Sequence, residues 1–368
     1  MQFRPRQQVT AAGVAVVALT LALGACSSSS SSSTPASNSS GGGSSSSGGS
    51  ANLSGTLNGS GSTFQLSFQQ AAISAFKSVQ SGMTVNYGGG GSGKGRTDLA
   101  AGTVNFAGSD STIPDKEASN FTGKTVLYFP VVIGPITLSY NLSGVSGLKL
   151  SAPVIAQIFS GKIKTWNDPA IKADNSGLSL PSTAITLAVR SDSSGTTANF
   201  SNFLVLAGGS AWTLGTSSTI KWPSTARAGS GNGGVAQIVK STTGAVGYVD
   251  YADAKASGLT FASIKNKAGN YIAPSTQSAT EAANNVTVKP NLTFSAIWAS
   301  GSGSYPVTYQ SWVLVYQKQS SSSTTKDLKD YVGYLVGDGQ KLLTELGYAP
   351  LPSSMDQKAK AQLSQIGS

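Results

Sequence analysis

The segment 189–197 holds the densest group of residues that could do chemistry; it reads Val-Arg-Ser-Asp-Ser-Ser-Gly-Thr-Thr. The guanidinium of Arg190 can donate two parallel hydrogen bonds to a tetrahedral oxyanion. Asp192 could hold that guanidinium in place. The other donors here are two hydroxyls and a main-chain amide, from Ser194, Thr196 and Gly195. The pattern predicts an anion-binding loop, and the alternative is a polar loop with a surface Arg–Asp pair.

Residues 87–95 form a glycine-rich run, Tyr-Gly-Gly-Gly-Gly-Ser-Gly-Lys-Gly. Consecutive glycines let main-chain amides approach an anion, and Ser92 adds a hydroxyl donor. The run is close to the P-loop pattern, but Gly95 stands where that pattern places the Ser or Thr that binds magnesium. We therefore interpret it as an anion cradle and not as a nucleotide-hydrolysing site.

A third loop, 59–64, reads Gly-Ser-Gly-Ser-Thr-Phe and precedes a predicted helix. Its glycines allow a ligand to approach the main chain, and the free amides of a helix N-terminus favour an anion. Thr63 adds a hydroxyl donor. The alternative interpretation is a capped helix that follows a glycine turn.

Asp110 lies in a fourth loop, 107–111, which reads Ala-Gly-Ser-Asp-Ser. A buried carboxylate facing a fully ionised anion such as sulfate would cost several kcal/mol. Monohydrogen phosphate instead carries a proton that it can donate to the carboxylate. Such a site would select phosphate over sulfate. The alternative is that Asp110 caps a helix near Pro114.

Short β-branched strands alternate with helices from Asn52 onward, which predicts an α/β fold with mainly parallel sheets. The predicted strands are 83–87, 104–106, 125–132, 184–189 and 246–249. The predicted helices are 68–79, 97–101, one beginning near Ser151, 196–207, 328–335 and 342–346. Ligands of such folds bind at the carboxyl ends of strands, where helices begin. The four loops described above lie at such junctions.

The composition limits the chemistry, because the 368 residues include no histidine and one cysteine, Cys26. The commonest general base and metal ligand is therefore absent, and no internal disulfide can form. We expect neither a metal nor a cofactor. The net charge is +10, but the basic residues are scattered and do not form the clusters of nucleic-acid-binding proteins, so we expect no nucleic-acid partner.

The first 51 residues read as an export signal followed by a tether. Residues 9–23 are nearly all apolar and too short for an ordinary membrane span, so 1–25 is predicted to be a signal peptide. Leu-Gly-Ala-Cys at 23–26 resembles the lipobox of bacterial lipoproteins, which implies acylation of Cys26; the alternative is an ordinary signal with a chance cysteine. Residues 26–51 are almost wholly Ser and Gly and are expected to be a disordered tether.

The four loops, in this order and spacing, resemble those of the phosphate-binding receptors of bacterial phosphate ABC transporters, the PstS family. Further stretches that resemble this family are 129–134, 158–166, 244–249 and 305–308. The resemblance implies a class II periplasmic-binding-protein fold, in which two α/β domains are joined by a hinge and the ligand cleft lies between them. It places 52–131 and 252–368 in one discontinuous domain and 132–251 in the other.

The resemblance also implies a division of the ligand contacts between the two domains. The first domain would supply Thr63, the amide of Phe64, Ser92 and Asp110, with Ser62 in support. The second would supply Arg190, Ser194, the amide of Gly195 and Thr196, with Asp192 in support. Inorganic phosphate would be enclosed by hinge closure and delivered to the membrane permease and ATPase subunits of the transporter. We expect a monomer, held by its lipid on the extracytoplasmic face of the cell membrane.

Three alternatives stay open at this point. A secreted phosphatase could use the same anion cradle, although the chain offers neither histidine nor a carboxylate cluster for metals. A surface adhesin could use the Ser/Gly tether. The ligand could also be another oxyanion, such as arsenate.

Overall fold

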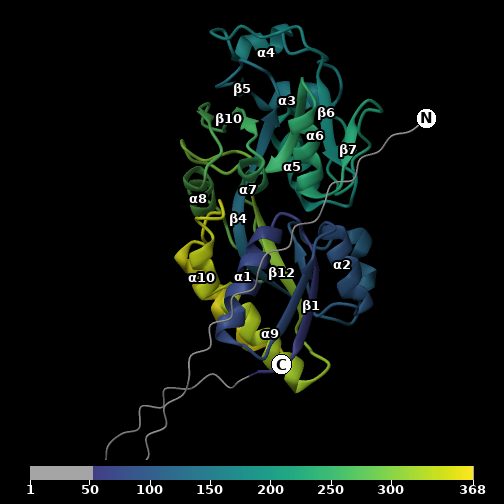
Figure 1. Cartoon of the computed structure of the whole chain (residues 1–368), viewed down its shortest axis with the longest axis vertical. Helices are drawn as coiled ribbons and strands as arrows, with labels where there is room; N and C mark the ends of the chain where they lie inside the picture. The colour runs from purple at the N-terminus through teal and green to yellow at the C-terminus, as the bar shows by residue number, and fades with distance from the viewer. Residues whose placement is uncertain (1–52, 368) are drawn as a thin grey trace, which may run out of the picture. The chain divides into compact units, whose positions relative to one another are not determined.

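Nine strands form one mixed sheet at the centre of residues 53–367, which are the residues described by a computed structural model (Figure 1). The sheet has the order β2-β1-β3-β12-β4-β8-β6-β7, with β9 paired to β4. Its strands are β1 Thr56–Gly61, β2 Thr84–Gly88, β3 Phe106–Ser109, β4 Val126–Tyr140, β6 Thr186–Arg190, β7 Arg227–Gly229, β8 Ala245–Asp250, β9 Thr260–Phe261 and β12 Thr308–Tyr316. A small second sheet has the order β11-β10-β5, from β5 Lys149–Leu150, β10 Ser263–Lys265 and β11 Tyr271–Ile272.

Strand β4 joins the two halves of the large sheet. Its residues 126–135 pair with β12, and its residues 136–140 pair with β8, both antiparallel. All its residues except Val126 are buried, which explains the continuous apolar run in the sequence. We call the part built on β1, β2, β3 and β12 the first half, and the part built on β6, β7 and β8 the second half. The expected parallel pairing occurs within each half, among β1, β2 and β3 and among β6, β7 and β8, whereas the centre is antiparallel.

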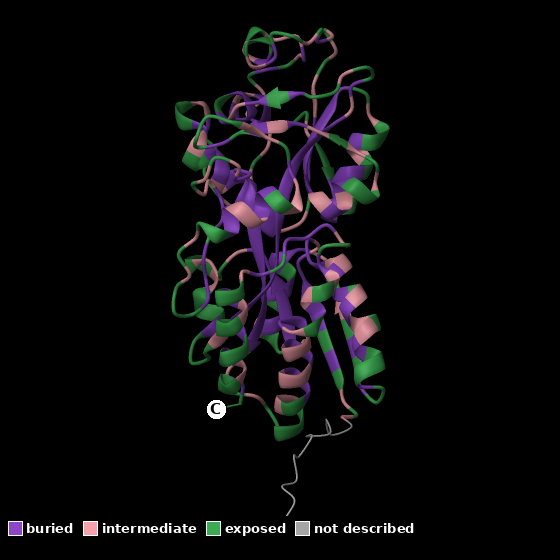
Figure 2. Ribbon diagram, turned by 90° about the vertical axis from the view of Figure 1, so that its left-hand side faces the viewer, coloured by how far each residue is buried: buried purple, intermediate pink, exposed green. Residues whose placement is uncertain are grey.

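Helices cover the faces of this sheet, and buried residues concentrate on its central strands, where Figure 2 shows the ribbon in purple. They are α1 Leu66–Val79, α2 Ser92–Ala101, α3 Ala152–Phe159, α4 Pro169–Asp174, α5 Gly195–Ala207, α6 Gly231–Ser241, α7 Tyr251–Ala256, α8 Thr276–Asn284, α9 Ser322–Leu335 and α10 Ser353–Gln362. Short 3₁₀ helices are η1 Asp115–Phe121, η2 Gly209–Ala211, η3 Asp338–Leu342 and η4 Leu363–Gln365. Within 53–367, none of the helices combines the length and the apolar character that crossing a bilayer requires.

The spacing of apolar residues in the sequence correctly predicted the positions of several of these helices. Phe68, Ala72 and Phe76 face the core from α1, as the period of the sequence predicts, and α3 begins with Pro153 in its first turn. The prediction of a helix over residues 342–346 is wrong. That segment consists of the end of η3 and turns, and Gly347 follows it in a left-handed conformation with φ 87°, which ends helical structure. Leu343 nevertheless reaches the core, and the C-terminal helix is α10, which begins after Pro352.

Three of the predicted elements have different bounds near the four loops. The strand predicted over 104–106 is β3, which extends to Ser109 and ends directly before Asp110. The short helix predicted over 97–101 is α2, which already begins at Ser92 inside the glycine-rich run. The helix expected near Pro114 is η1. Strands β1 and β12 were not predicted, and β1 includes the first glycines of the 59–64 loop.

A candidate anion-binding site between the two halves

The first half contributes a buried carboxylate with hydroxyl groups around it. Asp110 is only 1% exposed. Its Oδ1 accepts hydrogen bonds from Ser62 and Ser311 at 2.5 Å each. Its Oδ2 accepts one from Ser92 at 3.1 Å. Asp110 therefore does not act as a simple helix cap; it lies at the centre of a hydroxyl network at the carboxyl end of β3.

Two opposing influences act on the protonation of this carboxyl. Burial raises the pKa of Asp110 above its ordinary value, while the hydrogen bonds from Ser311, Ser62 and Ser92 and the charge of Arg190 work against that rise. The carboxyl thus holds a proton more readily than an exposed aspartate does. A group of this kind suits a ligand that shares a proton with it.

The second half contributes the guanidinium of Arg190 at the end of β6, where its side chain is almost wholly buried. Asp192 holds it with two hydrogen bonds, from Nε to Oδ1 at 2.8 Å and from Nη2 to Oδ2 at 2.5 Å. Nη1 reaches Thr196 Oγ1 at 3.4 Å. Burial alone would lower the pKa of Arg190, but the hydrogen bond and charge of Asp192 raise it instead. The guanidinium therefore stays charged and fixed in direction.

Two helices begin at the site. Helix α2 starts at Ser92, and helix α5 starts at Gly195, after Ser194 has capped it by accepting the N–H of Thr197 at 3.1 Å. Ser194, Gly195 and Thr196 are all buried. Helix N-termini carry partial positive charge and unpaired N–H groups, so both starts favour an anion between them.

The 59–64 loop completes the set from the first half. Helix α1 begins only at Leu66, so Thr63 and Phe64 lie in the turn before it. The amide of Phe64 donates to Ser62 Oγ at 3.1 Å, and the Phe64 ring is buried against Tyr309 with 4.0 Å between the ring centroids. The Thr63 hydroxyl contacts Asn232 of the second half.

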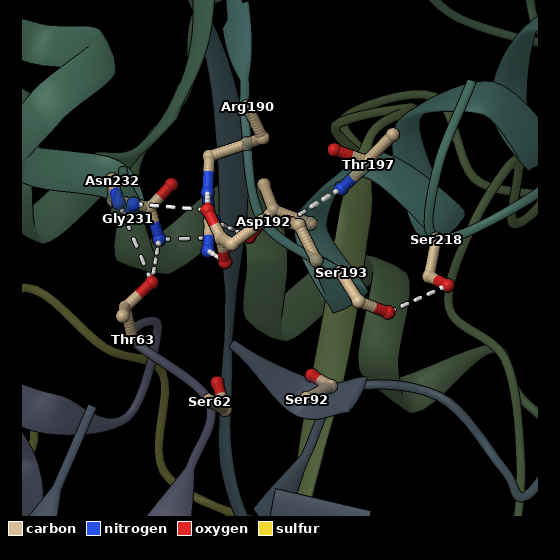
Figure 3. Close-up of polar contacts among 12 residues, drawn as sticks. Ser62, Thr63, Ser92, Arg190, Asp192, Ser193, Thr197, Ser218, Gly231 and Asn232 are labelled. Atoms are coloured by element: carbon tan, nitrogen blue, oxygen red, sulfur yellow. Dashed lines mark hydrogen bonds and ion pairs between the residues drawn. The ribbon is translucent and has the colours of Figure 1, made fainter. Parts of the chain in front are cut away.

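The two halves touch at this site (Figure 3), where Ser62, Thr63 and Ser92 face Arg190 and Asp192. The amide of Gly93 donates to the carbonyl of Ser193 at 3.0 Å. Asn199 donates from the second half to the carbonyl of Asp110 at 2.7 Å. A methyl group on Gly195 would overlap the Asp110 and Ser92 side chains, so this position needs glycine. All ten residues predicted for ligand binding or its support therefore lie at one junction.

Several residues of this junction were not predicted from the sequence. Ser311 lies in the middle of β12, where nothing in its neighbours marks it, and Gln65 Nε2 donates to its hydroxyl at 2.7 Å. Asn232 follows the glycine that begins α6, and the polar run around it could have drawn attention. Tyr248 was not predicted as part of the junction either. Its hydroxyl accepts a hydrogen bond from the main-chain N–H of Arg190 at 3.0 Å.

A family model described as a PBP superfamily domain matches residues 46–338. The phosphate-binding protein PstS of Pasteurella multocida is 37% identical over 313 residues, which cover 83% of this chain and 89% of that protein. The chain belongs to the PstS family. The phosphate-binding protein PstS 3 of Mycobacterium leprae is 33% identical, over 82% of this chain and 85% of that protein.

Solved structures of two phosphate-binding proteins show the same fold. The periplasmic phosphate-binding protein PfluDING, solved with bound phosphate, superposes with a TM-score of 0.69 at 20% identity, covering 83% of this chain and 93% of that one. The phosphate-binding protein of Stenotrophomonas maltophilia gives a TM-score of 0.67 at 20% identity, with the same coverage of 83% and 93%. The periplasmic-binding-protein fold expected from the loop motifs is thereby confirmed.

Proposed function

We propose that this chain is an extracytoplasmic receptor that binds inorganic phosphate and delivers it to the permease and ATPase subunits of a phosphate ABC transporter. One observation carries the proposal. A buried carboxylate from the first half and a fixed guanidinium from the second lie at one junction with two helix N-termini, in a chain of the PstS family. The relatives named above are binding proteins and not enzymes, so the phosphatase alternative is set aside.

The proposed ligand contacts follow from the donors of the junction, of which the amide of Phe64 would turn from Ser62 Oγ to the ligand. Phosphate would receive the hydroxyls of Thr63, Ser194 and Thr196 and the guanidinium of Arg190, with the amides of Phe64 and Gly195 at the adjoining turns. Ser92 now donates to Asp110, and by rotating its hydroxyl to the ligand it would free Oδ2. That oxygen would then accept the proton of monohydrogen phosphate. Asp192 and Ser62 would hold Arg190 and Asp110 in place.

Binding would proceed by closure of two domains, 52–131 with 252–368 against 132–251. The pairing of β4 supports a division of this kind with the first boundary moved from residue 131 to residue 135, because 126–135 pair with β12 of the first half and 136–140 pair with β8 of the second. Strands β9 and β10 pair with the last part of β4 and with β5, so residues 260–265 would move with the second half and not with the first domain, to which the predicted range 252–368 assigns them. The hydrogen bonds across the junction would form on closure and break on release.

Anchoring at the membrane is part of the proposal. The signal peptide 1–25, the acylated Cys26 and the tether 26–51 lie outside the described residues, and their support is the sequence pattern alone. Attachment of more than one acyl chain would hold the receptor stably beside its permease. Mass spectrometry of the N-terminal peptide tests this point, and an unmodified Cys26 in membrane-free protein would contradict it. Light scattering tests the expected monomer.

Calorimetric titration of phosphate, and then of sulfate, tests the binding function. The described residues 53–367 have their own hydrophobic core, so a chain of residues 52–368 suits the experiment. Prior partial unfolding and dialysis would remove any phosphate carried from expression. We expect one phosphate per chain and no heat from sulfate. Equal binding of both anions would overturn the selectivity argument, and binding of neither would overturn the receptor function and favour the adhesin. A parallel titration with arsenate measures the remaining oxyanion alternative.

A further inference from the structure

Asn232 lies at the start of α6 in the second half, and its side chain is wholly buried beside the proposed phosphate site. Figure 3 shows it next to Gly231, directly across from Thr63 of the first half. Its main-chain N–H donates to Thr63 Oγ1 at 3.4 Å, and its side-chain Nδ2 donates to the same oxygen at 3.3 Å. Nδ2 also donates to Thr196 Oγ1 at 3.5 Å. One amide thus contacts a hydroxyl from each half.

The contacts of Thr63 determine where its hydroxyl hydrogen can point. A hydroxyl group has two acceptor lone pairs and one hydrogen to donate. Both donors that reach Thr63 Oγ1 are N–H groups of Asn232, so both lone pairs of this oxygen are taken. Among the described residues, no acceptor contacts the Thr63 hydroxyl, so its hydrogen is left to donate to a ligand. Asn232 therefore decides that Thr63 acts as a donor.

The same reasoning applies to Thr196. Its Oγ1 receives Arg190 Nη1 at 3.4 Å and Asn232 Nδ2 at 3.5 Å, which again are obligatory donors. The Tyr309 hydroxyl lies 3.4 Å away and can accept as well as donate. The hydrogen of Thr196 therefore has two directions available, toward Tyr309 or toward an anion at the junction. Without Asn232, one lone pair of this oxygen would be open to a competing donor.

We propose that Asn232 is a positioning residue that turns the hydroxyl hydrogens of Thr63 and Thr196 toward the bound phosphate, and that its bond to Thr63 links the two halves. This inference rests on the proposed function, since both hydroxyls serve it only as phosphate donors. Asn232 acts through them and needs no contact of its own with the ligand.

The other end of the Asn232 amide supports a role in binding over a role in stability. Its Oδ1 is buried and has no hydrogen-bond partner within the described part of the chain. A buried acceptor without a partner destabilises the folded state, so an apolar residue of the same shape would be expected there if packing alone mattered. The presence of an amide at this position is accounted for by the hydrogen bonds that its nitrogen donates to the hydroxyls of Thr63 and Thr196.

The test compares phosphate affinity and stability in Asn232→Leu, which keeps the shape and the main-chain N–H but removes the side-chain donors. We expect the phosphate Kd to rise by about 10- to 100-fold, the effect of losing hydrogen bonds around a charged ligand. The thermal midpoint measured without phosphate should stay the same or rise. In a background with Thr63→Val and Thr196→Val, Asn232→Leu should change Kd by less than about threefold, because its targets are gone.

Asn199→Leu is the matched control. Asn199 also joins the halves through its amide, but it donates only to the main-chain carbonyls of Asp110 and Gly195. Its effect on Kd should be the same factor in the wild type and in the double-valine background. The inference is overturned if Asn232→Leu leaves Kd unchanged, if its loss persists in the double-valine background, or if it lowers the phosphate-free thermal midpoint by several degrees. Wild-type protein that binds no phosphate would instead overturn the proposed function, and this inference with it.

Discussion

The hydroxyl of Ser311 donates a 2.5 Å hydrogen bond to Oδ1 of Asp110, although 201 positions separate the two residues in the chain. The sheet makes this contact, because Trp312 of β12 pairs with Ser109 of β3, which sets the adjoining residues side by side. Ser62 donates to the same oxygen. Oδ1 is therefore fully used by the protein, and in the proposed binding mode Oδ2 is the oxygen that would meet the ligand after Ser92 rotates away.

Asp110→Asn should reduce the preference for phosphate over sulfate. The amide keeps the shape but presents a neutral group, so a fully ionised anion is no longer repelled and the proton of phosphate is no longer required. We expect the ratio of the sulfate Kd to the phosphate Kd to fall by about 100-fold or more, the scale of discrimination by a paired buried polar group. Calorimetry with both anions measures it. An unchanged ratio would show that the Asp110 carboxylate does not select phosphate by accepting a hydrogen bond from its proton.

Arg190→Lys should weaken phosphate binding although the charge is kept. Lysine cannot reproduce the paired bonds that Arg190 makes to Asp192 while a third nitrogen points at Thr196. Loss of one charge-assisted hydrogen bond corresponds to about 1.5–3 kcal/mol, or a rise in Kd of roughly 10- to 150-fold. Arg190→Gln, which also removes the charge, should weaken binding further. If the lysine variant binds like the wild type, charge and not geometry is what this residue contributes.

Gly93→Ala should oppose closure without harming the folded halves. A methyl group at this position would overlap the Ser193 side chain of the opposite half. Within α2 itself, alanine is favoured over glycine by up to about 1 kcal/mol, so the free energy of unfolding without phosphate should be unchanged or higher. The phosphate Kd should rise by about tenfold, as expected for overpacking of a contact.

Gly88→Ala serves as the control for that substitution. Gly88 lies at the end of β2, and a methyl group there would meet nothing within 4 Å. Its phosphate Kd should match the wild type. Equal affinities for the Gly93 and Gly88 variants would mean that the contact between Gly93 and Ser193 does not belong to the bound state.

Asp250→Asn should flatten the dependence of stability on pH. Asp250 is wholly buried at the end of β8, and its Oδ2 has no partner in the described residues. Burial and, after it, the charge of Asp253 raise the pKa of Asp250 well above 3.8. The folded state therefore binds this proton more tightly than the unfolded state does. The contribution of the protonated Asp250 carboxyl to the free energy of unfolding is fully present below pH 3.8. It is lost as the pH rises through the raised pKa of the folded state.

Urea unfolding without phosphate, repeated from about pH 5 to pH 9, measures this dependence. The wild-type free energy of unfolding should fall with rising pH in that range, and the slope should be smaller in the Asp250→Asn variant. Asp115→Asn, at an exposed carboxyl in η1, is the control and should keep the wild-type slope. Identical slopes in all three proteins would exclude Asp250 as the titrating group.

Much of the candidate site follows from local sequence. Strand-to-helix junctions bring glycines, hydroxyls and free amides together within a few residues, so the loops at 59–64, 87–95, 107–111 and 189–197 could be found one at a time. The pair Arg190 and Asp192 is two residues apart and forms as predicted. The apolar periods also placed α1, α3 and α5, because each of these helices buries one face by its own spacing.

The sequence by itself determined which loops carry the hydroxyls, glycines and Arg–Asp pair of the junction, the α/β class and the order of the loops, since these depend on neighbours along the chain. Only the tertiary structure decided that β12 lies between β3 and β4, which brings Ser311 to Asp110. It also decided that Asn232 meets Thr63, 169 positions away, across the two halves. Contacts of this kind depend on strand order and on how two halves meet, and no local spacing encodes either, because a polar residue in mid-strand or after a glycine has many possible partners until the sheet is assembled.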